Sequence, residues 1–486
     1  MANIEKYPGL YIEELNHFSA SVIPVETSMP LFIGYTEKDT SQVAHDRHLL
    51  PTRVASFPEY ERVFGAAQGE TNIVVTINET RDAAGHILTQ SVTAAFKTGG
   101  APAAPLRSPH ILSYAMRLFF ANGGGACYIV SVGLHTAAPG VIRLNELING
   151  LNAAGTENGP TMIVIPEAQG LCIADFATLQ DAALKQCAER QDRFVIMDVH
   201  GNDASPGDSH ASLRNIIETF RTRGVGTENL KYGAAYAPNI ETTVTFAFDD
   251  AAVEVVIVAN GSVQPTAPRN LTELKSLDLA RYGQAIGAIR EIPCVMPPSS
   301  TVAGVYVLMD TTRGVWKAPA NVALNLVTKP AIQYDTTLQD EMNVSVTGKS
   351  VNGVRQFPGR GTLVWGARTL DGNSTDWRYV NVRRFMTFVE TSVRLATESF
   401  VFEPNDARTW TRVQAMIENF LQNLWTQGGL MGDKPERAFF VHVGLGKTMT
   451  AQDILDGRLN IEIGVAVVRP AEFTVLAFSL KMIAAS

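Results

Sequence analysis

The segment Gly444-Leu445-Gly446-Lys447-Thr448 is the part of the sequence that most closely imitates a motif for chemistry. In a phosphate-binding loop, backbone N–H groups of a glycine-rich turn surround the phosphate, and a lysine reaches its oxygens. The spacing GxxxxGK[ST] requires glycine at position 441, and this chain has Val441. The run continues into Met449-Thr450-Ala451, whereas a phosphate cradle needs a helix N-terminus directly after the loop. We interpret the segment as a turn between strands, and we keep a nucleotide-binding enzyme that uses residues 444–448 as the alternative function.

Other residue types that support catalysis or metal binding are scattered along the chain. His45 and His48 have a helical spacing, but no third ligand lies near them in the sequence. The chain holds neither a GxSxG nor an HExxH motif. The four cysteines show no CxxC pair, and we interpret them as reduced core residues: Cys127, Cys172, Cys187 and Cys294. The sequence therefore predicts no catalytic residue, no metal site and no cofactor.

Length and composition limit the classes of protein that fit. The 486 residues are about three times the length of a domain of ~150 residues, which predicts two to four domains. With 40 Lys and Arg against 48 Asp and Glu, the formal charge is −8, which argues against direct binding of nucleic acid. The hydrophobic share of 45% allows a large core, and the charged share of 18% is low, which suggests a surface partly covered by partners. We find no secretory signal and no apolar run of membrane-spanning length, so we expect folding in the cytoplasm and no direct membrane insertion.

The first 260 residues predict an α/β core with insertions. Residues 1–28 are too polar and interrupted for a core of their own and form a candidate arm, whereas 29–34 reads as a buried strand. Residues 162–165, 176–190 and 194–199 predict a β–α–β unit. Two hairpins are predicted as surface insertions, one over 71–96 and one over 242–259 that turns at Asp249-Asp250.

The last 120 residues show the most regular pattern. Apolar residues at i, i+3 and i+4 predict a helix over 377–400, capped by Asp376, and a second helix over 408–427. Strands are predicted over 438–443, 459–468 and 473–480. The last strand is apolar on both faces, so it needs neighbours on both faces and along its edges.

Several stretches match one family in the order of the chain, from about residue 7 to residue 480. They include Tyr7–Glu14 (YPGLYIEE), Phe119–Gly124 (FFANGG), Pro297–Tyr306 (PPSSTVAGVY), Arg313–Asn321 (RGVWKAPAN), Asn352–Gly361 (NGVRQFPGRG), Val364–Leu370 (VWGARTL), Trp377–Arg384 (WRYVNVRR), Phe402–Asn405 (FEPN) and Arg469–Phe473 (RPAEF). Together these blocks resemble the contractile tail sheath proteins of phages and of phage-like injection systems. Leu10 and Ser300 depart from the valine and glycine that are usual there.

The resemblance implies a multi-domain, mixed α/β fold. The expected parts are an N-terminal arm over 1–28, an outer α/β part over 29–365 with insertions near 66–105 and 240–262, an inner sheath domain over 366–472, and a C-terminal arm strand over 473–486. In the inner domain, long helices would pack on a β-sheet that the terminal arms of neighbouring subunits complete. The arm residues implied in this strand exchange are Leu10, Tyr11, Ile12, Phe473, Val475, Leu476, Phe478 and Leu480.

The resemblance also implies a function and partners. The chain would be a structural subunit that polymerises as stacked rings around an inner tube, with a baseplate and a terminator or cap protein, and that contracts to drive the tube. It would assemble in the bacterial cytoplasm as part of a phage tail or a phage-like particle. Five arginines on the non-stripe faces of the two long helices are candidate contacts to an acidic tube, with a solvated helix face as the alternative interpretation: Arg378, Arg384, Arg394, Arg408 and Arg412.

Overall fold

The structure is a computed structural model that describes residues 21–39, 47–99, 104–137, 140–201, 210–264 and 268–471. It divides into two compact units. The larger unit holds Glu26–Phe388 and the chain from Val468 onward, and the smaller unit holds the chain up to Val25 together with Val389–Val467. The division falls inside helix α10 (Val380–Thr397) and not at the predicted residue 366, because one continuous helix begins in the larger unit and ends in the smaller.

A nine-stranded sheet organises the larger unit. From edge to edge its strands are β15 (Val322–Ala323), β18 (Gly361–Trp365), β17 (Val351–Phe357), β10 (Gly233–Ala237), β9 (Phe194–Asp198), β8 (Met162–Val164), β1 (Pro30–Thr36), β7 (Cys127–Leu134) and β2 (Thr52–Val54). The six strands from β17 to β7 run parallel, whereas β18 and β2 are antiparallel to their neighbours. The predicted buried strand at 29–34 is confirmed as β1.

Alternate residues of these strands feed two separate cores. In β1, Leu31 and Ile33 enter one core and Phe32 enters the other. A strand that is apolar on both faces must be covered on both, as is usual for parallel sheets. Helices α3 (Leu144–Ala154), α4 (Ile173–Arg190), α5 (His210–Thr219) and α9 (Thr336–Asn343) contribute to the first core, and α1 (Phe57–Phe64), α2 (Leu112–Ala121) and α8 (Ser299–Arg313) contribute to the second. The predicted β–α–β unit is confirmed as β8, α4 and β9.

Short elements complete the larger unit. A three-stranded sheet has the order β14 (Cys294–Met296), β11 (Ile240–Thr242) and β16 (Val327–Pro330). The pair β5 (Thr98–Gly99) and β6 (Ala104–Pro105) and the single turns η1 (Pro166–Gly170), η2 (Phe220–Gly224) and η3 (Leu230–Tyr232) lie in connections.

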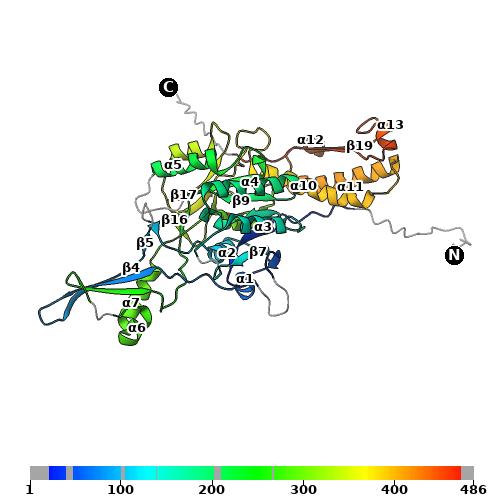
Figure 1. The fold of residues 1–486 in the computed structure, drawn as a ribbon. Helices are drawn as coiled ribbons and strands as arrows, with labels where there is room; N and C mark the ends of the chain where they lie inside the picture. Colours follow the sequence, from blue (N-terminus) through cyan, green and yellow to red (C-terminus); the bar gives the residue numbers. More distant parts are fainter. Residues whose placement is uncertain are drawn as a thin grey trace, which may run out of the picture. The chain divides into compact units, whose positions relative to one another are not determined.

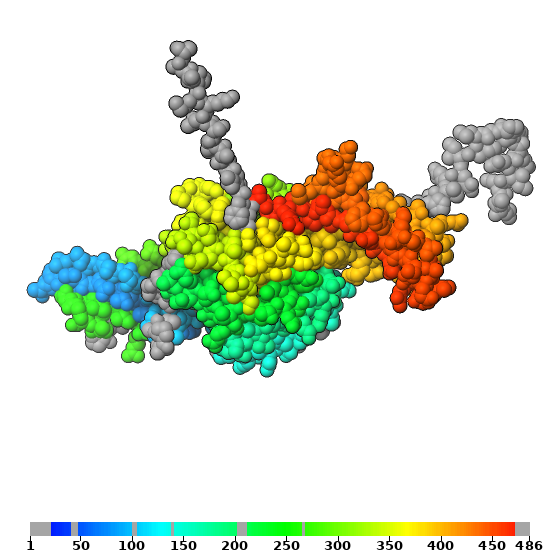
Figure 2. Space-filling view, turned by 90° about the horizontal axis from the view of Figure 1, so that it is seen from above, coloured from blue at the N-terminus to red at the C-terminus, as the bar shows by residue number. Residues whose placement is uncertain are grey.

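The two predicted insertions form one four-stranded sheet, which we call the outer sheet. Its order is β13 (Ser262–Val263), β12 (Glu254–Ala259), β3 (Ile73–Arg81) and β4 (Ile87–Phe96). Helices α6 (Leu271–Leu277) and α7 (Leu279–Arg290) share a core with its strands and lie beside the long β3–β4 hairpin (Figure 1). The β3–β4 hairpin, in blue, and the segment that contains α6 and α7, in green, also lie side by side in the space-filling view (Figure 2).

The first predicted hairpin is confirmed and the second is wrong. Residues 71–96 pair as β3 and β4, but β12 runs parallel to β3 and does not pair with 242–248. The reason is aromatic packing: Phe246 is buried, with its ring centroid 5.0 Å from that of Phe96 and 6.0 Å from that of Tyr114. The Tyr114 hydroxyl also accepts the N–H of Ala247 at 2.9 Å, which holds this segment away from β12.

The smaller unit consists of helices and a two-stranded sheet. After α10 come η4 (Glu398–Phe400), α11 (Ala407–Thr426), α12 (Pro435–Ala438), β19 (Phe439–Val443), α13 (Ala451–Leu455) and β20 (Ile461–Val465). The two long predicted helices and the first two predicted strands are thus confirmed, although the first helix starts at Val380 and Asp376 does not cap it. The third predicted strand lies outside the described residues. None of the helices in the described residues has both the length and the apolar character of a membrane span.

Candidate assembly surface

The β19–β20 sheet of the smaller unit is the candidate assembly surface. Its strands are antiparallel, with Val441 opposite Ile463 and Val443 opposite Ile461. Val441 and Val443 are buried, and β19 packs against α11, whose apolar stripe includes Val413. No residue of β20 is fully buried. One strand of the sheet is therefore well covered and the other is only half covered.

The opposite face of this sheet carries Phe440 and His442, both exposed. Phe440 lies opposite Gly464, and a Cβ atom at Gly464 would come within 2.1 Å of the Phe440 ring. The glycine thus leaves room for an aromatic ring across the strand, which sequence reasoning missed, although a glycine inside a strand is itself a signal of close approach. His442 faces Glu462, with 3.6 Å between Nδ1 and Oε2.

Both outer edges of the β19–β20 sheet lack a full strand neighbour within the described part of the chain. One isolated bridge, between Leu430 and Val467, continues the pairing beyond β20. A two-stranded sheet is marginally stable in water, and unpaired N–H and C=O groups at an edge are a template for another strand. This geometry suits strand addition, in which backbone hydrogen bonds supply affinity and side-chain pockets fix the register.

The eight predicted strand-exchange residues, from Leu10 to Ile12 and from Phe473 to Leu480, lie outside the described residues. The described chain ends at Ala471, which together with Pro470 forms part of a groove of about 280 Å³ in the larger unit. Trp365, Ala367 and Tyr379 line the same groove. The C-terminal segment therefore leaves the described structure at the larger unit.

The five arginines predicted as tube contacts fall into different surroundings. Arg384 is buried and forms an ion pair with Asp310, 2.6 Å between Nη2 and Oδ2, so it does not lie on an exposed helix face as predicted. Arg378 is half-buried and donates from Nε to the carbonyl oxygen of Ser374 at 2.9 Å. Both belong to the larger unit.

The other three arginines are exposed in the smaller unit. Arg394 lies 3.6 Å from Glu398, and Arg412 lies 3.8 Å from Glu403. Arg408 lies next to the cap of α11, where its charge and, above all, the N–H of Thr409 lower the pKa of Asp406. Because each arginine has an acidic neighbour, the local charge is nearly balanced, and such exposed pairs are weak.

The segment Gly444–Met449 forms a closed turn whose N–H groups are already occupied. The N–H groups of Lys447, Thr448 and Met449 point to the carbonyl oxygen of Gly444, and the N–H of Gly446 donates to Met449. The Thr448 hydroxyl donates to the Asn460 carbonyl at 2.7 Å, which ties the turn to the start of β20. A phosphate cradle needs free N–H groups and a following helix, and here the short helix α13 starts only at Ala451. The geometry fits the predicted turn between strands.

Two buried carboxylates hold elements of the larger unit together. Glu167 accepts the N–H groups of Tyr35 and Leu112 at 2.8 and 3.1 Å, and burial raises its pKa to about 8. Asp198 accepts the N–H and the hydroxyl of Ser299 at 2.8 and 2.5 Å, and burial raises its pKa to about 7. Each carboxyl group sits at the N-terminus of a helix, α2 or α8, where the N–H bonds favour its charged form, but burial outweighs them and raises the pKa. Each one caps a helix that is distant from it in the sequence. Sequence reasoning missed this role because the partners are far apart in the chain.

The cysteines and histidines show no arrangement for chemistry in the described ranges. All four cysteines are free thiols; three are buried, as predicted, but Cys172 is exposed. His200 contacts the carbonyl oxygen of Leu171 at 2.7 Å. Among the described residues, no group of three His, Cys, Asp or Glu side chains is placed to hold a metal ion.

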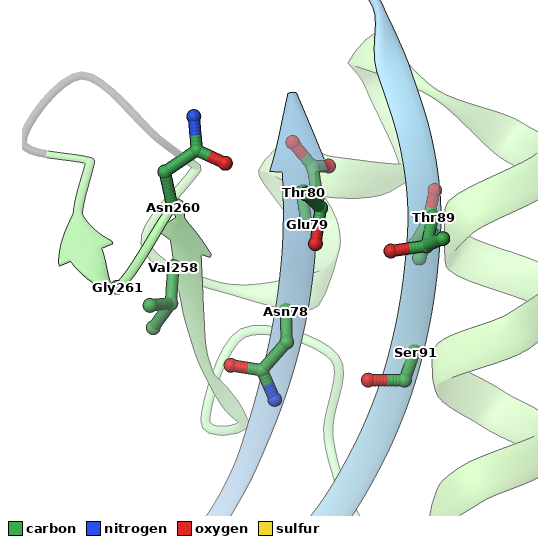
Figure 3. Close-up of a pocket in the computed structure, with 9 residues that line it drawn as sticks. Asn78, Glu79, Thr80, Thr89, Ser91, Val258, Asn260 and Gly261 are labelled. Atoms are coloured by element: carbon green, nitrogen blue, oxygen red, sulfur yellow. The ribbon is translucent and has the colours of Figure 1, made fainter. Parts of the chain in front are cut away.

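The outer sheet carries a shallow polar hollow (Figure 3). Asn78 on β3 lies between Val258 on β12 and Ser91 on β4. Glu79, which also lines the hollow, forms ion pairs with Arg81 and Arg281 at 2.5 and 2.8 Å. The carboxylate is thus already neutralised, and the hollow lacks a base and nucleophile in contact.

Comparisons with known proteins agree on one class. The family described as phage tail sheath C-terminal domain matches residues 373–481. The tail sheath protein of Vibrio phage KVP40 is 23% identical over 135 residues, which are 28% of this chain and a fifth (20%) of that protein's length.

Solved structures match over nearly the whole chain. A subunit of the PVC sheath complex, an extracellular contractile injection system in the contracted state, is 28% identical, with a TM-score of 0.62 and 98% of both chains covered. A chain of the six-fold symmetrised baseplate of the anti-feeding prophage is also 28% identical, with a TM-score of 0.58, 99% of this chain and 100% of that chain covered.

Proposed function

We propose that this chain is a member of the contractile tail sheath family and acts as a structural sheath subunit. In this role it polymerises helically around an inner tube and contracts to drive the tube through a target envelope. The observation that carries the proposal is the match over 98% of both chains to a sheath subunit in the contracted state. The alternative, a nucleotide-binding enzyme built on residues 444–448, has no support from the closed turn found there.

The proposed partners follow from the same similarities. The subunit would bind copies of itself in a helical polymer, since the PVC relative is part of a sheath complex. The similarity to a chain of the anti-feeding prophage baseplate supports a baseplate contact. An inner tube and a terminator or cap protein complete the proposed set. Assembly in the bacterial cytoplasm and later release as a phage tail or a phage-like particle is the proposed localisation.

Strand exchange is the proposed means of assembly. It is supported by the half-covered β20 and by the edges of the β19–β20 sheet, which have no full strand neighbour within the described ranges. In the proposal, arm residues 10–12 and 473–480 of neighbouring subunits occupy those edges. An arm of eight residues gains roughly 1.5–3 kcal/mol for each large side chain it buries. Ordering its backbone costs roughly 1–2 kcal/mol per residue, so one arm becomes decisive only when a docked subunit holds it in place.

The proposed tube contact is reduced to the arginines that remain accessible. Arg394, Arg408 and Arg412 are exposed in the smaller unit. Arg378 is half-buried and would contribute less, and Arg384 is buried in its ion pair with Asp310. Because acidic neighbours offset the three exposed charges, the contact would be weak, as a surface that must release the tube requires.

Electron microscopy of the protein expressed alone tests both the sheath and the arm proposals. The full-length chain should form long, hollow, ridged cylinders, and a chain lacking residues 473–486 should not. Cylinders that survive the truncation would contradict the C-terminal arm mechanism and keep the sheath. Monomers that stay monomeric even after addition of the cognate tube protein would contradict the sheath proposal itself.

A further inference from the structure

Two described segments of the larger unit lie close to the chain termini in sequence, and we call them the arm roots. The N-terminal root is Glu26–Met29, and the C-terminal root is Val468–Ala471. Both roots lie within the described residues and both belong to the larger unit. The residues that hold each root can therefore be identified directly.

Asn381 holds the C-terminal root. Its Nδ2 donates to the carbonyl oxygen of Val468 at 3.0 Å and to that of Trp316 at 2.8 Å. Asn381 is 1% exposed, and its Oδ1 is buried without a hydrogen-bond partner in the described residues. A buried amide in this position uses both of its N–H groups on carbonyls, and one of them belongs to the root. Leaving an acceptor unpaired is costly, which argues that the two donated bonds fix this residue.

Arg384 holds the N-terminal root. Its Nη2 donates to the carbonyl oxygen of Thr27 at 2.9 Å. The guanidinium is also bound in a two-bond ion pair to Asp310, with 2.9 Å from Nη1 to Oδ1 and 2.6 Å from Nη2 to Oδ2. The Thr161 hydroxyl donates to the same Thr27 carbonyl at 2.7 Å, so this carbonyl accepts two hydrogen bonds.

The two holding residues lie on the same helix, three positions apart. Residues at i and i+3 are neighbours on one face of an α-helix. One turn of α10 therefore binds the roots of both arms. The turn contacts a hydrophobic core of the larger unit, because Arg384 stacks over the Tyr306 ring at 5.0 Å and the Tyr306 hydroxyl is 2.7 Å from that of Tyr236 on β10.

We propose that this turn of α10, with Asn381, Arg384 and Asp310, is a mechanical clamp that passes tension from one terminal arm to the other. This inference rests on the proposed function, in which the two arms connect a subunit to its neighbours. Force that reaches one arm root then passes to the other root across a single helical turn. Arg384 is thus a force-bearing residue and not a tube contact.

Shear resistance of assembled cylinders tests the clamp with two matched controls. The clamp variants are Asn381→Ala and Arg384→Met. The first control is Asn352→Ala, because Asn352 is 1% exposed and also donates to two carbonyl oxygens, those of Ala235 and Arg368. The second is Arg193→Met, because Arg193 is fully buried and donates to Ala154 and Glu157. Neither control residue contacts an arm root in the described structure.

Cylinders of all variants are sonicated at fixed energy, and their lengths are measured by electron microscopy. The clamp variants should break into pieces several-fold shorter than wild type, whereas the controls should keep the wild-type length even where the subunit melts at a lower temperature. Equal breakage of clamp and control variants would overturn the proposal, because it would show only a general loss of stability.

Hydrogen exchange of the unassembled full-length subunit separates this inference from the sheath proposal. Asn381→Ala should speed amide exchange at residues 468–471, and Arg384→Met should speed it at residues 26–29, with neither control changing these segments. If wild type forms no cylinders, the sheath proposal fails while the root contacts are still tested. Unchanged exchange at both roots in both clamp variants would overturn the clamp.

Discussion

The nine-stranded sheet of the larger unit and the two-stranded sheet of the smaller unit differ in how fully their strand edges and faces are covered. In the large sheet, every parallel strand has two neighbours and alternate side chains enter two cores. In the small sheet, each strand has one neighbour among the described residues, and Ile461, Ile463 and Val465 of β20 remain half-exposed. The first sheet is complete within one chain, whereas the second has no full strand neighbour at either outer edge in the described residues, which fits the proposed completion by another chain.

This difference indicates which sheet stabilises the fold of the subunit and which one would support polymerisation. Burial of apolar surface is the dominant stabilising contribution to a fold, so the large sheet carries most of the subunit's stability. An open edge contributes little to the free subunit but offers hydrogen bonds to a partner. Substitutions in the two sheets should therefore have opposite effects on folding and on polymerisation.

The largest expected effect comes from exchanging one isoleucine in each sheet. Ile196→Ala in β9 removes a fully buried side chain, and we expect it to lower the free energy of unfolding by about 2–5 kcal/mol. Ile463→Ala in the half-covered β20 should cost about 1 kcal/mol or less in the free subunit. Urea unfolding measures both losses.

Polymerisation should rank these two variants in the reverse order. Ile196→Ala subunits that remain folded should still form cylinders, whereas Ile463→Ala should reduce their yield, because it removes a side chain against which an added strand packs. If Ile463→Ala assembles as well as wild type, β20 is not part of the assembly surface.

A pH effect of intermediate size should separate a buried carboxylate of the larger unit from an exposed one of the smaller unit. Burial raises the pKa of Asp198 from 3.8 to about 7, so between these pH values the folded chain holds a proton that the unfolded chain has released. Stability should then rise as the pH falls from 7 toward 4. Asp198→Asn should remove this gain, which is about 3 kcal/mol between pH 8 and pH 5.

The control for this pH effect is Asp433→Asn, which removes an exposed carboxylate. Chemical unfolding at pH 5 and at pH 8 is measured for both variants and for wild type. The free energy of unfolding of wild type minus that of Asp198→Asn should be larger at pH 5 than at pH 8. The same difference for Asp433→Asn should hardly change between the two pH values. An Asp198→Asn difference independent of pH would mean that Asp198 keeps an ordinary pKa in the folded chain.

The smallest expected effect concerns one helix cap in each unit. Thr450 caps α13 in a reciprocal pair with Asp453, and α13 buries none of its residues. Thr450→Ala should lower local stability by about 1 kcal/mol and raise hydrogen exchange over Ala451–Leu455 alone. Asn270→Ala, at the cap of α6, should instead affect the whole core of the outer sheet, because α6 buries Leu271 and Leu274 there. A Thr450→Ser variant should restore the wild-type exchange.

Periodicity predicted the elements whose burial is regular. The helix at 408–427 and the hairpin at 71–96 were readable because their apolar residues repeat at 3.6 or at 2 positions. The parallel pairing of β3 with β12 was not readable, because it joins segments about 180 residues apart and no local pattern encodes a distant partner. The local turn at Asp249-Asp250 suggested a hairpin, but packing of Phe246 against Phe96 and Tyr114 outweighed it.

The contacts of Arg384 and Asn381 were also not readable from the sequence, because their partners lie far away in the chain. Helical spacing placed Arg384 on a polar face, but a charged residue on such a face can also point into a neighbouring element that supplies a carboxylate. Asp310 is that carboxylate, and 74 residues separate it from Arg384. Likewise, the sequence does not show that Asn381 donates a hydrogen bond to the carbonyl oxygen of Val468, because 87 residues separate the two. The family resemblance located the blocks that contain these residues, whereas their contacts required the fold.

The composite origin of the outer sheet has a consequence for engineering. Its four strands come from two segments, 73–96 and 254–263, and the parallel register from Val74–Glu254 to Glu79–Ala259 joins them. A foreign module that replaces only one segment would leave the other with an exposed, aggregation-prone edge. An exchange of the outer sheet between related proteins must therefore replace both segments together. A short peptide fused at the tight turn around Gly85 would instead leave the shared register untouched, which makes this turn the natural place for display.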